Sequence, residues 1–256
     1  MITATAAAAQ SPAAEPCLAD EPATGEHATG PATGRIARVP DAVTLGLGDG
    51  TLVRLADLGL PADRAAEAAL LERLARLVGA ETRLHRSHPE PDRYGRVHAQ
   101  VVLSGTGVWL QADLLARGLA FVAPDAMSDR CVGRLLEIES RARADGIGPG
   151  SGALPAMAAG DPALADRLGT FVTVEGTVVS VGGSHGNVYV NFGEDWSKDF
   201  TVIASRRDIK RWPQAEQNLD RLQGRRVRVR GYVERWNGPL IRIEHPAQVE
   251  IRADER

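Results

Sequence analysis

The sequence predicts a mainly β protein with helices, arranged as two barrels in succession. Runs of alternating apolar residues are separated by Gly-containing turns, as in RIARVPDAVTLGLGDGTLVRL. The first half has the order strands, helix, strands, helices, which is typical of a five-stranded barrel with helices packed outside it. A length of 256 residues with 43% hydrophobic residues is enough for two globular domains.

The first folded domain is predicted at residues 34–150. Two strands meet at Asp49-Gly50, a strong hairpin signal, and a helix follows over 62–78, ending at Gly79. A polar loop with two prolines comes next. The remaining predicted elements are a turn at DRYGR with a strand to Leu103, a short strand at 108–110, a helix ending at Gly118 and a helix at 129–144.

The second folded domain is predicted at residues 168–251, after a linker at 151–167 that is rich in Gly, Ala, Pro and Ser. FVTVEGTVVSV, NVYVNFG and DFTVIAS indicate three strands, RRDIKRWPQAEQNLDRLQG a helical connector, and RVRVRGYVERWNGPLIRIEH a hairpin. Three strands, a helix and two strands is the order of the OB-fold.

Residues 1–33 are predicted to be a disordered tail, because their Ala, Pro, Thr and Gly cannot bury enough apolar surface to fold. Two interpretations stay open: a remnant of a signal peptide on an exported, periplasmic protein, or a plain tail on a cytoplasmic one. Cys17 and Cys131 are too few for a zinc site; they form a disulfide if the protein is exported and stay as thiols otherwise. No apolar run is long enough to span a membrane.

Two segments carry a family resemblance: DRYGRVHAQVVL at 92–103 and ADLLARGLAFV at 112–122. Their order and spacing resemble the staphylococcal nuclease-like (thermonuclease) family, here a bacterial member. The resemblance implies a barrel of OB type in the first domain, and so two OB-like barrels in tandem. It also implies nucleic acid as the partner, which the net charge of −3 alone does not predict.

In active members of that family two aspartates hold calcium, a glutamate acts as general base and two arginines clamp the phosphate. Both arginines are kept here, as Arg54 and Arg96. The three carboxylates fall on Val43, Gly59 and Ala62. Arginines bind a phosphate without making a nucleophile, so the resemblance implies a pseudoenzyme that is weak or inactive. No cofactor is expected, and calcium only if the site is active.

Alternatives remain at the first domain. An active calcium-dependent nuclease requires relocated carboxylates, for which Asp41 and Asp57 are the candidates; we interpret them instead as a turn residue and a solvated strand-end residue. Arg96 is either a phosphate ligand or the partner of a carboxylate that fixes the turn. His85 and His88 lie in the predicted loop, and we interpret them as exposed rather than metal-binding. A third alternative is a non-catalytic protein-interaction module.

The second domain is predicted to bind nucleic acid, single-stranded in particular, because OB barrels combine stacking aromatic residues with a basic groove. Arginines alternate along one predicted strand and form an outward stripe, unless that face is only a solvated barrel exterior. The candidate contact residues are Tyr189, Trp196, Arg228, Arg230, Arg235 and Trp236.

Overall fold

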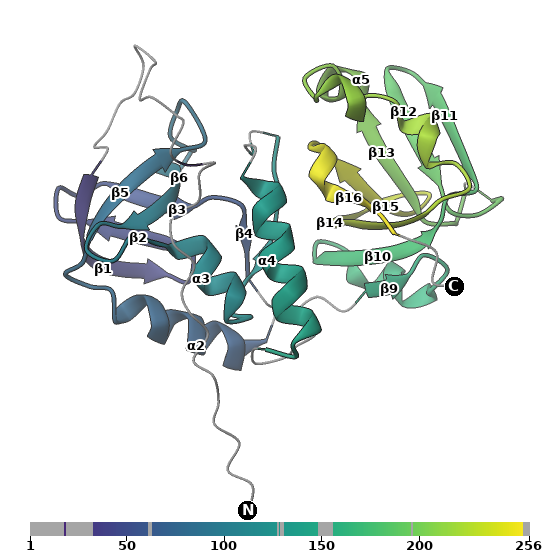
Figure 1. Cartoon of the computed structure of the whole chain (residues 1–256). Coiled ribbons are helices and arrows are strands. Elements are labelled where there is room, and N and C mark those ends of the chain that lie inside the picture. Colours follow the sequence, from purple (N-terminus) through teal and green to yellow (C-terminus); the bar gives the residue numbers. More distant parts are fainter. Residues whose placement is uncertain are drawn as a thin grey trace, which may run out of the picture. The chain divides into compact units, whose positions relative to one another are not determined.

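The computed structural model describes residues 18, 33–60, 63–126, 128, 131–147, 156–195 and 197–252. The chain is mainly β with few helices, and it divides into two units (Figure 1). The first unit comprises Met1–Val122 and Ser128–Ala153, and the second comprises Ala123–Met127 and Leu154–Arg256. The predicted tail therefore lies almost entirely outside the described residues.

Five strands of the first unit pair in a closed ring. Strand β1 pairs with β2 and β5, β2 pairs with β3, and β6 pairs with both β3 and β5. Only β3–β6 is parallel. The strands are β1 (Thr33–Asp41), β2 (Thr44–Leu47), β3 (Leu52–Leu55), β5 (Glu81–Arg86) and β6 (Arg96–Leu103). The predicted mainly β first domain is thus confirmed at the level of its strands.

Local turn chemistry explains where these strands begin and end. The predicted hairpin joins β2 to β3, where the Asp49 carboxylate accepts a hydrogen bond from the Thr51 amide at 3.0 Å and Gly50 has a φ of 91°. The run before it was predicted as one strand, but it is β1 and β2. Asp41 ends β1, because its carboxylate accepts from the Val43 amide at 2.9 Å and turns the chain.

The ring is accompanied, among the described residues after Thr33, by the helices α2 (Arg64–Ala75), α3 (Leu110–Ala116) and α4 (Val132–Ala144). Helix α2 begins where the Asp63 side chain accepts from the Ala65 amide at 3.0 Å, and it buries Leu70 and Leu74. Two short strand pairs complete the unit: β7 (Val108–Trp109) on β6, and β4 (Leu58–Gly59) with β8 (Phe121–Val122). Among the described residues, no helix has both the length and the hydropathy to cross a membrane.

The second unit is an eight-stranded sheet in which β13 and β15 are parallel. Its strand order is β11-β12-β13-β15-β14-β10-β9, with β16 on β14. Its strands are β9 (Ala156–Ala158), β10 (Phe171–Thr177), β11 (Ser180–Ser184), β12 (Asn187–Asn191), β13 (Thr201–Ser205), β14 (Arg226–Trp236), β15 (Gly238–Ile243) and β16 (Val249–Ile251).

Several boundaries of the second unit differ from the prediction. The described part of the predicted linker contains β9 and the 3-10 helix η1 (Pro162–Arg167), whose Leu164 is buried in the core. The connector after β13 is helical only in short turns: α5 (Arg206–Ile209), η2 (Gln214–Glu216) and η3 (Leu219–Leu222). Its Trp212 packs in the core and its indole donates to the Glu244 carbonyl at 2.9 Å. Buried apolar anchors rather than helix length therefore hold this connector.

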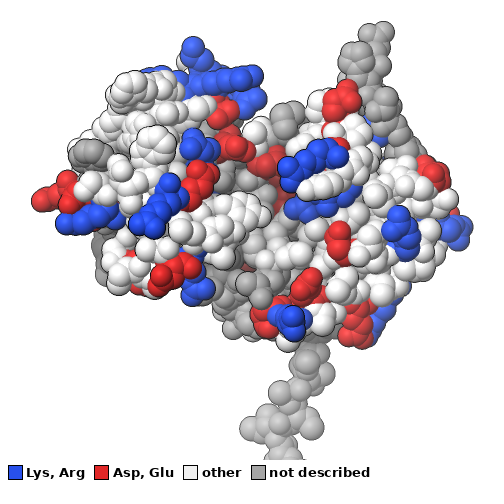
Figure 2. All heavy atoms as spheres, turned by 180° about the vertical axis from the view of Figure 1, so that it is seen from behind, with Lys and Arg blue, Asp and Glu red and all other residues white. Residues whose placement is uncertain are grey.

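Charged side chains of both signs are interspersed over most of the face that Figure 2 shows. This mixture agrees with the small net charge of −3.

Candidate functional site

A polar row crosses three strands of the first unit. Thr44 on β2 is the cross-strand partner of Arg54 on β3, and Arg54 is the partner of His98 on β6. Cross-strand partners project to the same side of a sheet. The flanking Val53 and Val97 are buried in the core. The row therefore lies on the side of the sheet that faces away from the core.

Arg96 begins β6, two residues before His98, and so projects to the same side. Its Nε and Nη2 atoms both lie 2.8 Å from the Asp92 Oδ2 atom. The other oxygen of Asp92 accepts the backbone amides of Tyr94 and Arg96, each at 2.9 Å. Arg96 is therefore the partner of a carboxylate that fixes the turn, which was one of the two interpretations of the sequence.

Asp92 neutralises part of the positive charge of Arg96 only when its carboxyl group is ionised. Burial disfavours the ionised carboxylate, but hydrogen bonds from the backbone and side chain of Arg96, the Tyr94 amide and His98 outweigh it and hold the pKa of Asp92 far below its ordinary value. Asp92 is thus an anion at neutral pH. The Arg96 guanidinium has more N–H groups than its contacts to Asp92 and Thr44 use. It can therefore donate to an added anion while it stays paired with Asp92.

Arg54 supplies the second guanidinium of this face. It is half-buried, and its Nη2 atom donates to the Leu58 carbonyl at 3.4 Å. The exposed ring of Tyr94 lies nearby, with the guanidinium carbon of Arg96 at 5.1 Å and that of Arg93 at 4.8 Å from its centroid. Two guanidinium groups held in this way can bind a phosphate in a bidentate manner, whereas the Thr44 hydroxyl is buried beneath Arg96 and does not reach solvent.

Two of the positions at which the resemblance implies a carboxylate are described, and neither has room for one. Gly59 stands against Phe121, and a Cβ atom there would overlap the Phe121 ring. Since Phe121 is itself buried, an aspartate at Gly59 has no room. Val43 is buried, and its amide is used by the turn at Asp41. Ala62 lies outside the described residues.

Asp57 is not a solvated strand-end residue, so that interpretation is wrong. Its side chain is buried at 5% relative exposure and its φ is 59°. Its carboxylate accepts from the Gln100 amide at 2.7 Å and from the Ser128 hydroxyl, while Gln100 accepts from the Trp109 indole at 2.9 Å. A strand pattern cannot reveal this, because the partners come from distant segments. Neither Asp41 nor Asp57 belongs to a potential metal-binding group among the described residues.

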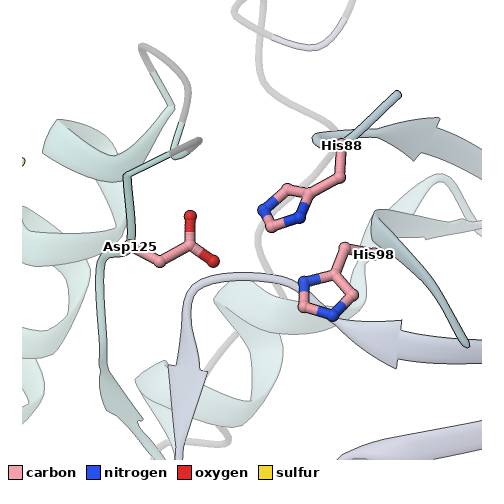
Figure 3. Close-up of side chains that lie close together, drawn as sticks. All are labelled: His88, His98 and Asp125. Atoms are coloured by element: carbon pink, nitrogen blue, oxygen red, sulfur yellow. The ribbon is translucent and has the colours of Figure 1, made fainter. Parts of the chain in front are cut away.

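His98 is the residue of this site that the sequence analysis missed. Its Nε2 atom lies 3.4 Å from Asp92, and its ring stacks on His88 with centroids 4.3 Å apart (Figure 3). His88 lies in the predicted loop but is half-buried, and His85 is half-buried within strand β5, so neither is fully exposed as predicted. Asp125, also labelled in Figure 3, groups with the second unit. Within the described part of the first unit taken alone, no three potential ligand atoms lie close enough together to share an ion.

The predicted outward stripe of arginines on β14 is wrong for Arg230, which is 1% exposed. Arg230 pairs with Glu250 of β16 at 2.7 Å, because β16 lies beside this part of β14. Arg228 is mostly buried and lies 2.5 Å from Glu175, its cross-strand partner on β10. Burial opposes ionisation of Glu175, but Arg228 and Arg226 lower its pKa on balance. These arginines stabilise the sheet and are poorly placed to contact nucleic acid.

The other candidates of the second unit differ in exposure. Trp236 is 70% exposed and Arg235 is exposed, both at the end of β14 where Asn237 makes the turn with a φ of 64°. Tyr189 is half-buried on β12, opposite Gly182. Trp196 lies outside the described residues. The structure thus keeps Trp236, Arg235 and Tyr189 at least partly accessible.

Cys131 stands at the start of α4, fully buried and disulfide-bonded. The only other cysteine of the sequence, Cys17, lies outside the described residues.

The chain matches no protein-family model, and it has no significant match among curated proteins. Its resemblance to the thermonuclease family rests on its own residues.

Proposed function

We propose that the first unit binds nucleic acid through its phosphodiester backbone, as a divergent relative of the thermonuclease family. The observation that supports this most is the placement of Arg54 and Arg96 on neighbouring parallel strands, projecting to the same side beside Thr44. Guanidinium pairs of this kind match the geometry and charge of phosphate.

We propose that the first unit binds nucleic acid but cleaves its phosphodiester bonds weakly or not at all. Phosphodiester hydrolysis of this type needs a metal ion and a base to make the nucleophile. The three family positions for these groups hold Val43, Gly59 and Ala62, and Asp57 is already committed to Gln100 and Ser128. No observation on the described residues favours the calcium-dependent nuclease with relocated carboxylates.

We also propose that both units are OB-type barrels. The ring of the first unit and the sheet of the second share one order, in which the third strand pairs in parallel with the fifth and the fourth is antiparallel to the first. In the second unit β10 and β11 stand for the two halves of one bent first strand. The disulfide at Cys131 supports export to an oxidising compartment such as the periplasm.

Fluorescence anisotropy with labelled single-stranded DNA and RNA of about 12 nucleotides tests the binding. The double variant R54A/R96A is expected to bind more weakly, with a log–log salt slope less steep by about 1.4, because two phosphate contacts are lost. R64A/R141A removes two exposed arginines of α2 and α4 and serves as the control. Equal losses in both variants, or no loss in R54A/R96A, would contradict the proposal, and cleavage in the presence of calcium would replace it by the nuclease.

The substitution Asp92→Asn is expected to raise the affinity for nucleic acid, whereas R54A/R96A is expected to lower it. Asparagine keeps an oxygen for the amides of Tyr94 and Arg96 but removes the charge that competes for Arg96. The affinity for the oligonucleotide is therefore expected to rise by about threefold, a modest change for one screened charge. An unchanged or weaker affinity in a folded D92N protein means that Arg96 serves the turn alone.

A further inference from the structure

A cluster of basic side chains lies at the end of strand β13 in the second unit. Its members are Arg206, Arg207, Lys210 and Arg211, on and just after the short helix α5, and we call them the α5 patch. All four are exposed. Figure 2 shows a group of blue spheres at its upper left, at the end of the unit where Figure 1 places α5. Elsewhere on this face positive and negative side chains are mixed.

Half of the described arginines of this unit pair with a carboxylate, but in the α5 patch only one of the four basic side chains does. Arg226, Arg228 and Arg230 on β14 pair with Glu175 or Glu250. In the α5 patch only Arg211 is paired, with Asp208. The Asp208 carboxylate also accepts from the Ser205 hydroxyl at 2.5 Å, so the one acid of this segment is engaged.

Arg206, Arg207 and Lys210 make no ion pair with any residue that the structure describes. Three positive charges thus stand together without a compensating carboxylate. Repulsion between these charges raises the electrostatic free energy of the folded protein. A bound anion reduces this repulsion, so the cluster favours anion binding.

The fold makes room for this cluster. The Arg206 amide donates to the Gly186 carbonyl at 2.8 Å, which places the start of α5 beside the β11–β12 turn. The Arg206 Nη2 atom lies 2.5 Å from the position that a Cβ atom would take on Gly183. Glycine at 183 therefore leaves the space in which the Arg206 guanidinium lies.

We propose that the α5 patch is a second contact surface for the nucleic-acid backbone. The proposal rests on the proposed function because the ligand is the same, but it uses another unit and other residues. Spaced cations without carboxylates fit the repeating phosphates of a strand. A nucleic-acid strand is favoured over a membrane surface, because the neighbouring residues Ser184, His185 and Asn187 are polar and supply no apolar side chain to insert into a bilayer.

The test compares the full chain with the triple variant R206Q/R207Q/K210Q in anisotropy titrations with a single-stranded DNA of about 20 nucleotides, long enough for two OB-sized sites. The salt slope of the triple variant is expected to be less steep by about 2, with an affinity about tenfold lower at 0.1 M salt. R167Q/R225Q/R252Q removes the same charge from other parts of the second unit and is expected to change the slope by less than half as much.

The outcomes separate the two proposals. Loss in the triple variant with no loss in R54A/R96A supports the α5 patch and contradicts binding at the first unit. Loss in R54A/R96A with an unchanged triple variant overturns the α5 patch alone. Equal losses in the triple variant and its charge control also overturn the patch, since net charge then explains both. Binding of the wild type to phosphatidylserine vesicles, without binding to the oligonucleotide, overturns both proposals.

Discussion

At the scale of one residue, Gly59 leaves no room for a side chain, and so none for the carboxylate that the proposed thermonuclease ancestry implies at this position. A Cβ atom at this position would overlap the Phe121 ring, and Phe121 is buried. Gly59→Asp is therefore expected to lower the free energy of unfolding by about 3 kcal/mol through overpacking and a confined carboxylate. Urea unfolding measures this cost, and calorimetry with calcium is expected to show no binding.

Gly105→Asp is the matched control, because nothing lies within 4 Å of a Cβ atom at that exposed glycine. Its free energy of unfolding is expected to change by no more than about 0.5 kcal/mol. If G59D were as stable as G105D, Phe121 would have to move easily and the first unit could accept a metal ligand after all.

Individual site residues were predictable only when their role is local in sequence. DRYGR identified Arg96 and its turn, since Asp92 and Arg96 are four residues apart and meet in any tight turn. The burial of Asp57 depends on Gln100 and Ser128, which are distant in the chain, so a strand pattern does not predict it. His98 occupies an alternating strand position beside Arg96, so its place on this face is visible in the sequence.

Among the elements, strands with a strong apolar alternation were predicted and weak ones were missed. Strand β5 has only Thr82 and Leu84 directed to the core, and its other residues are polar, so it resembled a loop. The arginines of β14 alternate as an outward stripe should. Pairing with β10 and β16 nevertheless supplies Glu175 and Glu250, and an isolated strand pattern contains no information on such neighbours.

The pair Glu175–Arg228 between β10 and β14 makes stability depend on pH. Its arginine partners hold the pKa of Glu175 below the ordinary 4.5 despite burial, so the ionised form stabilises the folded state. This contribution is fully present above pH 4.5 and is lost as the pH falls through the lower folded pKa. Glu175→Gln is expected to cost about 2 kcal/mol at pH 7, because Arg228 loses its charged partner.

Urea unfolding of the wild type and E175Q at pH 7 and at pH values below 4.5 checks this expectation. The difference between the two proteins should shrink as Glu175 becomes protonated. A difference that stays constant with pH would mean that shape, and not charge, stabilises the β10–β14 pair.

At the scale of the whole molecule, the two-unit organisation followed from composition and strand order, whereas the role of the N-terminal segment depends on Cys131. The sequence has two cysteines, and we predict that Cys131, which is disulfide-bonded, pairs with Cys17. The bridge would close a loop of over 100 residues, and the entropy lost by the unfolded chain predicts a stabilisation of about 5 kcal/mol. Cys17→Ser is expected to lower the free energy of unfolding by this amount, and dithiothreitol should lower it equally in the wild type while leaving C17S unchanged.

Mass spectrometry under non-reducing conditions should show the wild type two hydrogens lighter than its reduced form. A wild type with two free thiols would contradict both the bridge and the export that it supports.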